Sequence, residues 1–158
     1  MNKKTVRLNE ADLMKMIKES TKKYLNEEEE LENNNDGTEG VDFLSRLEGY
    51  HQALKMMHWS TDNHSKHLLT DDIDKSILEF EDEVAENLMG ITGTKISSGL
   101  ETNKPSTKDL KELLSELERD VLEFIGEYEG DKSNRGLINI CDDFLSQVNK
   151  YKYLETLS

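Results

Sequence analysis

The chain is poor in the residues that break helices or cross-link chains. Its 158 residues include one proline and one cysteine, and aromatic residues make up 6%. Hydrophobic and charged residues each account for 34%, a balance typical of a highly solvated helical protein and not of a β-sandwich or barrel. A chain of this length is sufficient for one domain with a hydrophobic core. We therefore expect a single all-α domain without strands.

Other absences bear on the compartment and on membranes. The lone Cys141 has no second cysteine with which to form an intramolecular disulfide or a zinc site, which favours a reducing environment. No apolar segment follows the basic residues Lys3, Lys4 and Arg7. Nor does any apolar run approach the roughly 18 residues that a membrane helix needs. We expect a cytoplasmic protein, or one packaged from the cytoplasm, without membrane contact.

Charge is distributed unevenly along the chain. Asp and Glu number 34 against 20 Lys and Arg, which gives a net charge of -14. Residues 1–25 carry seven basic and three acidic side chains, net +4, so the remainder carries -18. Because phosphate contacts require clustered Lys and Arg, the acidic body is not expected to bind nucleic acid. The basic N-terminal segment supports at most weak DNA attachment at low salt.

Two segments precede the body of the protein. Residues 1–25 have apolar side chains at helical spacing, with Asn9 suited to cap a helix. These apolar positions are Leu8, Leu13, Met16 or Ile17, Tyr24 and Leu25. A single helix of this length is marginal in water, so this leader is either a frayed tail or a docking peptide for a protein partner. Residues 26–40, rich in Glu, Asn, Asp and Gly, predict a disordered linker.

Four amphipathic helices are expected in residues 41–158. The first begins near Val41, and the second runs from about His67 to Met89. The third is capped by Ser106 or Thr107, and the fourth follows a turn at residues 131–136 and reaches the C-terminus. Their apolar positions are Leu44, Leu47 and Leu54 in the first, Ile73, Ile77, Phe80, Val84 and Leu88 in the second, Leu110, Leu114, Leu117, Val121, Phe124 and Tyr128 in the third, and Leu137, Cys141, Phe144, Val148 and Tyr151 in the fourth. Since each helix has one stripe to bury, the predicted fold is an antiparallel four-helix bundle.

The second of these helices has a second stripe. His67, Asp71, Leu78, Asp82 and Glu86 are centred roughly 140° from the apolar stripe, at about 100° per residue. If the apolar stripe packs into the bundle, the acidic stripe faces outward. A symmetric dimer then brings His67 and Asp71 of one chain toward Asp82 and Glu86 of the other.

The residue types on the second stripe suit a metal site. Carboxylates with one or two imidazoles favour Fe(II) and Mn(II), because hard anionic ligands stabilise the oxidised metal and a bridging carboxylate holds two ions close together. The spacing is equally compatible with a solvated acidic face, and His51 and His58 are equally suited to be core histidines. The string from Glu48 to His51 has the Glu-x-x-His form of ferritin di-iron sites, but the sequence has no second one. We interpret it as chance.

A resemblance to a known family favours the metal site. His58-Trp59, then His67 with Asp71, then the run from Asp82 to Glu86 resemble the signature of Dps-type miniferritins, in which an HW pair precedes H-x-x-x-D and D-E-[LVI]-A-E segments. The resemblance implies a ferritin-like bundle and a di-iron site between two subunits. It also implies that His58, His67 and Asp71 act as ligands from one subunit. Asp82 and Glu86 are then the ligands from the other, with Mn or Zn as alternative metals.

The chain departs from the family pattern at three places. The connection from Ile91 to Pro105 predicts no helix of its own, where the family usually has a short one. The segment between His58 and His67 is shorter and lacks the family's Gly-Pro turn, which bears on the relative position of the two histidines. Asn87 stands where the family commonly has an arginine that forms a salt bridge between subunits. We therefore expect a homo-oligomer that is at least a dimer. Whether the subunits assemble further into a closed cage is not predicted.

The leader has a resemblance of its own. Residues 5–27 are similar to a short leader found on several proteins of crAss-like tailed phages, which implies a phage-encoded protein of the host cytoplasm or the virion. Two hypotheses follow. The first is a Dps-like ferroxidase that oxidises Fe(II) with peroxide or oxygen and stores the product. The second is a non-catalytic ferritin-like module that docks through its leader.

Overall fold

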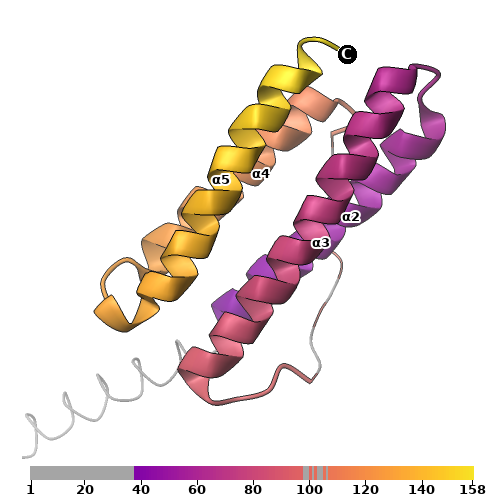
Figure 1. Cartoon of the computed structure of the whole chain (residues 1–158). Coiled ribbons are helices and arrows are strands. Elements are labelled where there is room, and N and C mark those ends of the chain that lie inside the picture. The colour runs from indigo at the N-terminus through magenta and orange to yellow at the C-terminus, as the bar shows by residue number, and fades with distance from the viewer. Residues whose placement is uncertain (1–37, 98–99, 101, 103–104, 106) are drawn as a thin grey trace, which may run out of the picture. The chain divides into compact units, whose positions relative to one another are not determined.

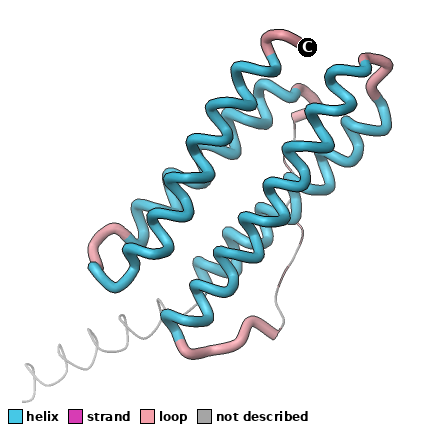
Figure 2. Tube along the Cα trace, viewed as in Figure 1, coloured by secondary structure: helices cyan, strands magenta, loops and turns pink. Residues whose placement is uncertain are grey.

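The computed structural model describes residues 38–97, 100, 102, 105 and 107–158, and these residues are helical apart from short connections (Figures 1 and 2). The helices are α2 (Thr38–Ser60), α3 (His64–Thr92), α4 (Leu110–Tyr128) and α5 (Arg135–Glu155), with a short 3-10 turn, η1 (Lys132–Asn134), before α5. The all-α four-helix prediction is confirmed. The predicted leader helix and most of the predicted linker lie outside the described residues.

Helix α2 begins earlier than the sequence suggested. It starts at Thr38, so residues 38–40, which we assigned to the linker, form its first turn. Gly40 is buried, and a Cβ atom built there would lie 2.8 Å from Cδ1 of Leu88. The close approach of α2 to the end of α3 depends on glycine at this position, because a larger residue would contact Leu88. The bundle therefore includes residues 38–40, which composition alone assigned to a linker.

Helix α3 is longer than predicted at both ends. Its N-cap is Asn63, whose side-chain oxygen accepts hydrogen bonds from the backbone N–H groups of Ser65 (2.8 Å) and Lys66 (3.3 Å). Its C-cap is Gly93, at φ +68° in the left-handed region, while Gly90 continues the helix. The glycine that ends α3 is thus the one that must adopt positive φ, not the first one in the sequence.

The starts of the last two helices also differ from the prediction. Asp109, and neither Ser106 nor Thr107, caps α4 by accepting from the backbone N–H of Glu112 at 3.0 Å. Thr107 instead donates to the carboxylate of Glu112 at 2.7 Å, which fixes the chain just before the cap. Helix α5 begins at Arg135, within the segment predicted as a turn.

The connection between α3 and α4 determines the topology. Leu88 and Tyr128, near the ends of α3 and α4, both lie beside Gly40 at the start of α2. Further along, Gln52 on α2 donates to Thr102 of the connection at 3.3 Å. The connection therefore travels the length of α2, so that α3 and α4 run in the same direction while each is antiparallel to its packed neighbours (Figure 1). One long crossover of this kind is the ferritin-like arrangement.

The core contains the predicted stripes together with four buried residues that were not predicted: Phe43, Tyr50, Leu69 and Leu113. The predicted apolar positions of α2, α3, α4 and α5 are buried, except that Tyr128 and Tyr151 are half-buried at its edge. Two aromatic stacks cross it, Phe43 on Phe124 with ring centroids 4.1 Å apart and Phe80 on Phe144 at 3.9 Å. Within the described part of the chain, no helix has both the length and the apolar character needed to cross a membrane.

One buried polar contact joins α2 to α4. The Tyr50 hydroxyl, 3% exposed, donates to the Asp120 carboxylate, 6% exposed, at 2.8 Å. Burial, and then this hydrogen bond, raise the pKa of Tyr50 far above its ordinary value. Arg119 donates to the other oxygen of Asp120 at 3.2 Å, so each oxygen of this buried carboxyl group has a hydrogen-bond donor.

Removal of the Tyr50 hydroxyl tests this contact. Tyr50→Phe leaves a buried carboxylate without one of its donors, so the free energy of unfolding should fall by about 1.5–3 kcal/mol. Urea unfolding measures the change. Tyr153→Phe is the matched control because that ring is 64% exposed, and it should change stability by less than about 0.5 kcal/mol. Equal effects of the two substitutions would contradict the assignment.

Candidate metal site

The end of α2 and the start of α3 hold two histidines in reciprocal contact. Nδ1 of His58 lies 3.0 Å from the backbone oxygen of His67, and Nδ1 of His67 lies 3.1 Å from the backbone oxygen of His58. The two rings stack with centroids 3.8 Å apart at an interplanar angle of 25°. We call this pair of hydrogen bonds the histidine clasp. The short turn between the helices thus brings the two imidazoles together.

The histidine clasp determines which ring nitrogen carries the proton. A backbone carbonyl oxygen only accepts hydrogen bonds, so each Nδ1 must be the donor. In the neutral ring, Nε2 is then unprotonated and keeps its lone pair. Metal-binding histidines are commonly oriented in this way, with the other ring nitrogen donating to a carbonyl or carboxylate. Both side chains are therefore in the tautomer that a metal ion requires at Nε2.

Asp71 lies one helical turn after His67. Its carboxylate forms an ion pair with Lys75, Nζ to Oδ2 2.6 Å, and its side chain is 45% exposed. The hydrogen bond from Lys75 lowers the pKa of Asp71, and the nearby His58 and His67 lower it further. This carboxylate is thus ionised, and Lys75 is its ion-pair partner.

Asp82 and Glu86 lie on the same side of α3 but further along it. Both are exposed, and Asp82 follows Asp71 by about 16 Å at a rise of 1.5 Å per residue. Within one chain, the described residues contain no group of three His, Cys, Asp or Glu side chains placed to hold a metal ion. One chain therefore brings His58 and His67 together, but it does not place Asp71 with them as a group of three, and Asp82 and Glu86 lie further along α3.

The two faces of α3 have the predicted characters. Its apolar stripe is buried, with Ile77 and Val84 at 0% exposure. The other stripe, which we call the outer face, consists of His67, Asp71, Lys75, Leu78, Asp82 and Glu86. Leu78, in its middle, is 40% exposed. The outer face is thus available to a partner, because no other described segment of the chain covers it.

His51 has a different role from the histidine clasp. Its Nδ1 lies 2.6 Å from Oδ1 of Asp74, which is 8% exposed. This is the paired core histidine that the sequence left open as one interpretation. Glu48, the other member of the Glu-x-x-His string, does not join it at a metal site among the described residues.

An acidic patch crosses from α2 to the outer face of α3. Burial raises the pKa of Glu81 to about 7, and the neighbouring carboxylates of Glu48 and Asp82 add to the shift. Near neutral pH the Glu81 carboxyl group is therefore partly protonated. A divalent cation nearby would favour the ionised form.

The raised pKa of Glu81 predicts a pH-dependent stability. The folded protein holds this proton up to about pH 7, whereas the unfolded chain releases it near 4.5, so stability from this group is present below pH 4.5 and is lost as the pH rises to 7. Glu81→Gln should therefore be more stable than wild type at pH 8, relative to pH 4.5, by on the order of 1 kcal/mol, a figure reduced for solvent screening.

Urea unfolding at the two pH values measures the difference, and Glu83→Gln, an exposed neighbour, serves as the control. A difference between wild type and Glu81→Gln that is the same at both pH values would show that this carboxyl does not titrate as described.

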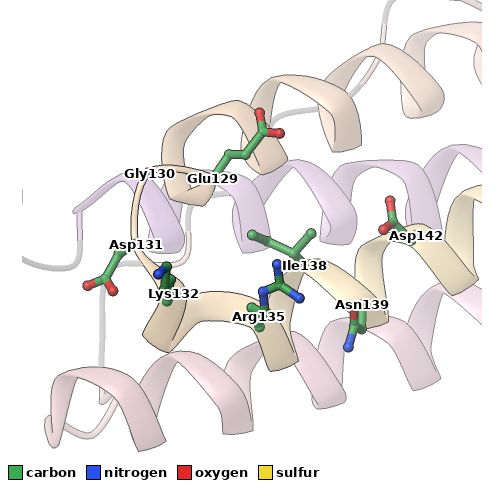
Figure 3. Close-up of a pocket in the computed structure, with 8 residues that line it drawn as sticks. All are labelled: Glu129, Gly130, Asp131, Lys132, Arg135, Ile138, Asn139 and Asp142. Carbon is green, nitrogen blue, oxygen red and sulfur yellow. The ribbon is translucent and has the colours of Figure 1, made fainter.

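A cavity of about 480 Å³ lies elsewhere, at the turn between α4 and α5 (Figure 3). Lys132 and Arg135 line it together with Glu129, Asp131 and Asp142. Both cations and carboxylates line it, and its lining includes no histidine. This cavity has none of the features of the histidine clasp, and we assign it no chemistry.

Sequence reasoning missed Lys75. The ion pair with Asp71 is visible in the sequence as an acidic residue followed four positions later by a lysine on a helix. A lysine is not a metal ligand, so a motif of metal-binding residues does not include Lys75.

Comparison with known proteins gives one match. A protein-family model matches residues 58–154, a segment that begins at the first histidine of the clasp and ends near the end of α5. The family is described as a family of unknown function (DUF5856). No curated protein matches the chain, and no solved structure does.

Proposed function

The chain belongs to the DUF5856 family of unknown function, and we propose that it is a Dps-like ferroxidase that oxidises Fe(II) at a di-iron site shared by two subunits. The histidine clasp is the observation that supports this most. Two imidazoles, each with Nδ1 donating to a carbonyl and Nε2 free of its proton, stand beside an ionised Asp71. Iron(II) favours such a combination of nitrogen and carboxylate donors.

The second half of the site comes from a partner subunit. Asp71 and Asp82 are equally far from the middle of the outer face, as are His67 and Glu86. A twofold axis between Lys75 and Leu78 therefore places Asp82 of the partner subunit opposite Asp71, and the same operation builds a second, identical site. The fifth proposed ligand, Glu86 of the partner subunit, falls opposite His67.

Each residue has a role in the proposed reaction. His58 and His67 bind iron through Nε2, and Asp71 assists as an anionic ligand. Across the interface, Asp82 binds and Glu86 bridges the two ions. Two Fe(II) substrate ions each give one electron to hydrogen peroxide, which takes up two protons and leaves as two water molecules. Oxygen is the alternative oxidant, and Mn or Zn are the alternative occupants.

Metal titration with outer-face variants tests the proposal. Wild-type protein should bind two Fe(II) per chain under anaerobic conditions and oxidise them rapidly when peroxide is added. Asp82→Ala and Glu86→Ala should weaken binding by about 10- to 100-fold and slow oxidation, since each removes a charge from the site. Glu83→Ala, an equally exposed carboxylate outside the outer face, should behave as wild type.

Sedimentation of the same samples gives the solution mass. The proposal requires at least a dimer, because a monomer lacks the ligands of the partner subunit. Iron binding no greater in wild type than in the two outer-face variants, or a strictly monomeric protein, would refute the shared site.

The second candidate is a non-catalytic ferritin-like module. Lys75 already neutralises Asp71 at 2.6 Å, which favours a face built for protein contact over one built for ions. In this function the leader, residues 1–25, docks the module onto another protein in the host cytoplasm or the virion of a phage. The titration above separates the two functions, because the module binds no stoichiometric iron.

A further inference from the structure

Lys75 lies on the outer face among the proposed ligands. Its ammonium group is 2.6 Å from Oδ2 of Asp71. At about 100° per residue, Lys75 projects within roughly 40° of both Asp71 and Asp82. Its side chain is 63% exposed, so it is free to reach beyond its own helix.

The proposed twofold axis passes beside this lysine. In a symmetric pair of α3 helices, Lys75 of one chain faces the region of Leu78 and Asp82 of the partner subunit. The ammonium already bound to Asp71 is then next to the carboxylate that completes the same site. This step rests on the proposed function, because it uses the same pairing of outer faces.

We propose that Lys75 is the resident cation of the shared site, which bridges Asp71 and Asp82 of the partner subunit in the metal-free dimer and must be displaced when metal binds. The bridging ammonium is a positioning group and not a ligand. With this ammonium in place, the two chains associate without metal. Metal then binds less tightly, because it must displace the ammonium.

Charge balance is the physical reason for such a cation. Each shared site collects Asp71 from one chain with Asp82 and Glu86 of the partner subunit, three carboxylates in a small volume. Like charges this close repel strongly once water is partly excluded. In a single chain the exposed ion pair contributes little, but at an interface the same ammonium offsets part of this repulsion. Two divalent ions would do the same, so lysine and metal compete for one role.

Substitution of the lysine tests the proposal on the full chain. Lys75→Met keeps the aliphatic part of the side chain and removes the charge, while Lys75→Arg keeps the charge. The control is Lys150→Met, on the exposed side of α5. Two readouts are needed: sedimentation with chelator or with Zn(II), and the dissociation constant for Zn(II) by titration.

The wild type should be dimeric with chelator and with Zn(II), as should Lys150→Met and Lys75→Arg. Lys75→Met should dissociate in chelator, reassociate with Zn(II), and bind Zn(II) about tenfold more tightly. If all four proteins dimerise and bind Zn(II) equally, the resident cation is refuted while the shared site stands. If none of them dimerises or binds Zn(II), the shared site fails and this inference fails with it.

Discussion

The antiparallel register of α2 against α3 is the constraint on which the candidate site depends. His58 faces His67, and two helical turns away His51 faces Asp74. The same register that buries Leu54 and Ile73 in the core therefore sets both histidine contacts at its edge. A shift of one residue would turn each side chain by about 100° and separate the rings of the histidine clasp. Packing energy in the core thus maintains the geometry of a polar site to which the core contributes no atoms.

Much of this was accessible from the sequence because helical periodicity is strong in every element. The buried stripe of α3 and its outer face were both predicted, and the fold depends on little else. The limits of helices were harder to predict. Gly90 and Gly93 both resemble C-caps in the sequence, and only the local φ distinguishes them. Asp109 and Thr107 are both capable N-caps, and the one that bonds Glu112 N–H is decided by the path of the connection.

The candidate site was predictable only as a set of residues on one face. Sequence spacing does not give the positions of backbone carbonyl groups. Each hydrogen bond of the histidine clasp has a backbone carbonyl oxygen as its acceptor. The tautomer that His58 and His67 adopt when neutral could therefore be inferred only from the structure. The partner of His51 is a second example, because an aspartate on a neighbouring helix has no fixed sequence distance. Contacts within one helix, such as that of Asp71 with Lys75, have a fixed sequence distance of three or four residues. This ion pair was therefore predictable from the sequence, although it was not predicted.

The composition of the outer face links association to ion binding. Leu78 is 40% exposed and Leu68, near its edge, is 52% exposed, so two copies that meet there bury only a modest apolar area. The carboxylates that a metal needs are the same groups that repel a second copy. Any cation that stabilises the pooled carboxylates must therefore stabilise the dimer, and dimer formation must by the same free energy raise the affinity for that cation. In the proposed dimer, assembly and cation binding would therefore be coupled, with the Lys75 ammonium as the cation when metal is absent.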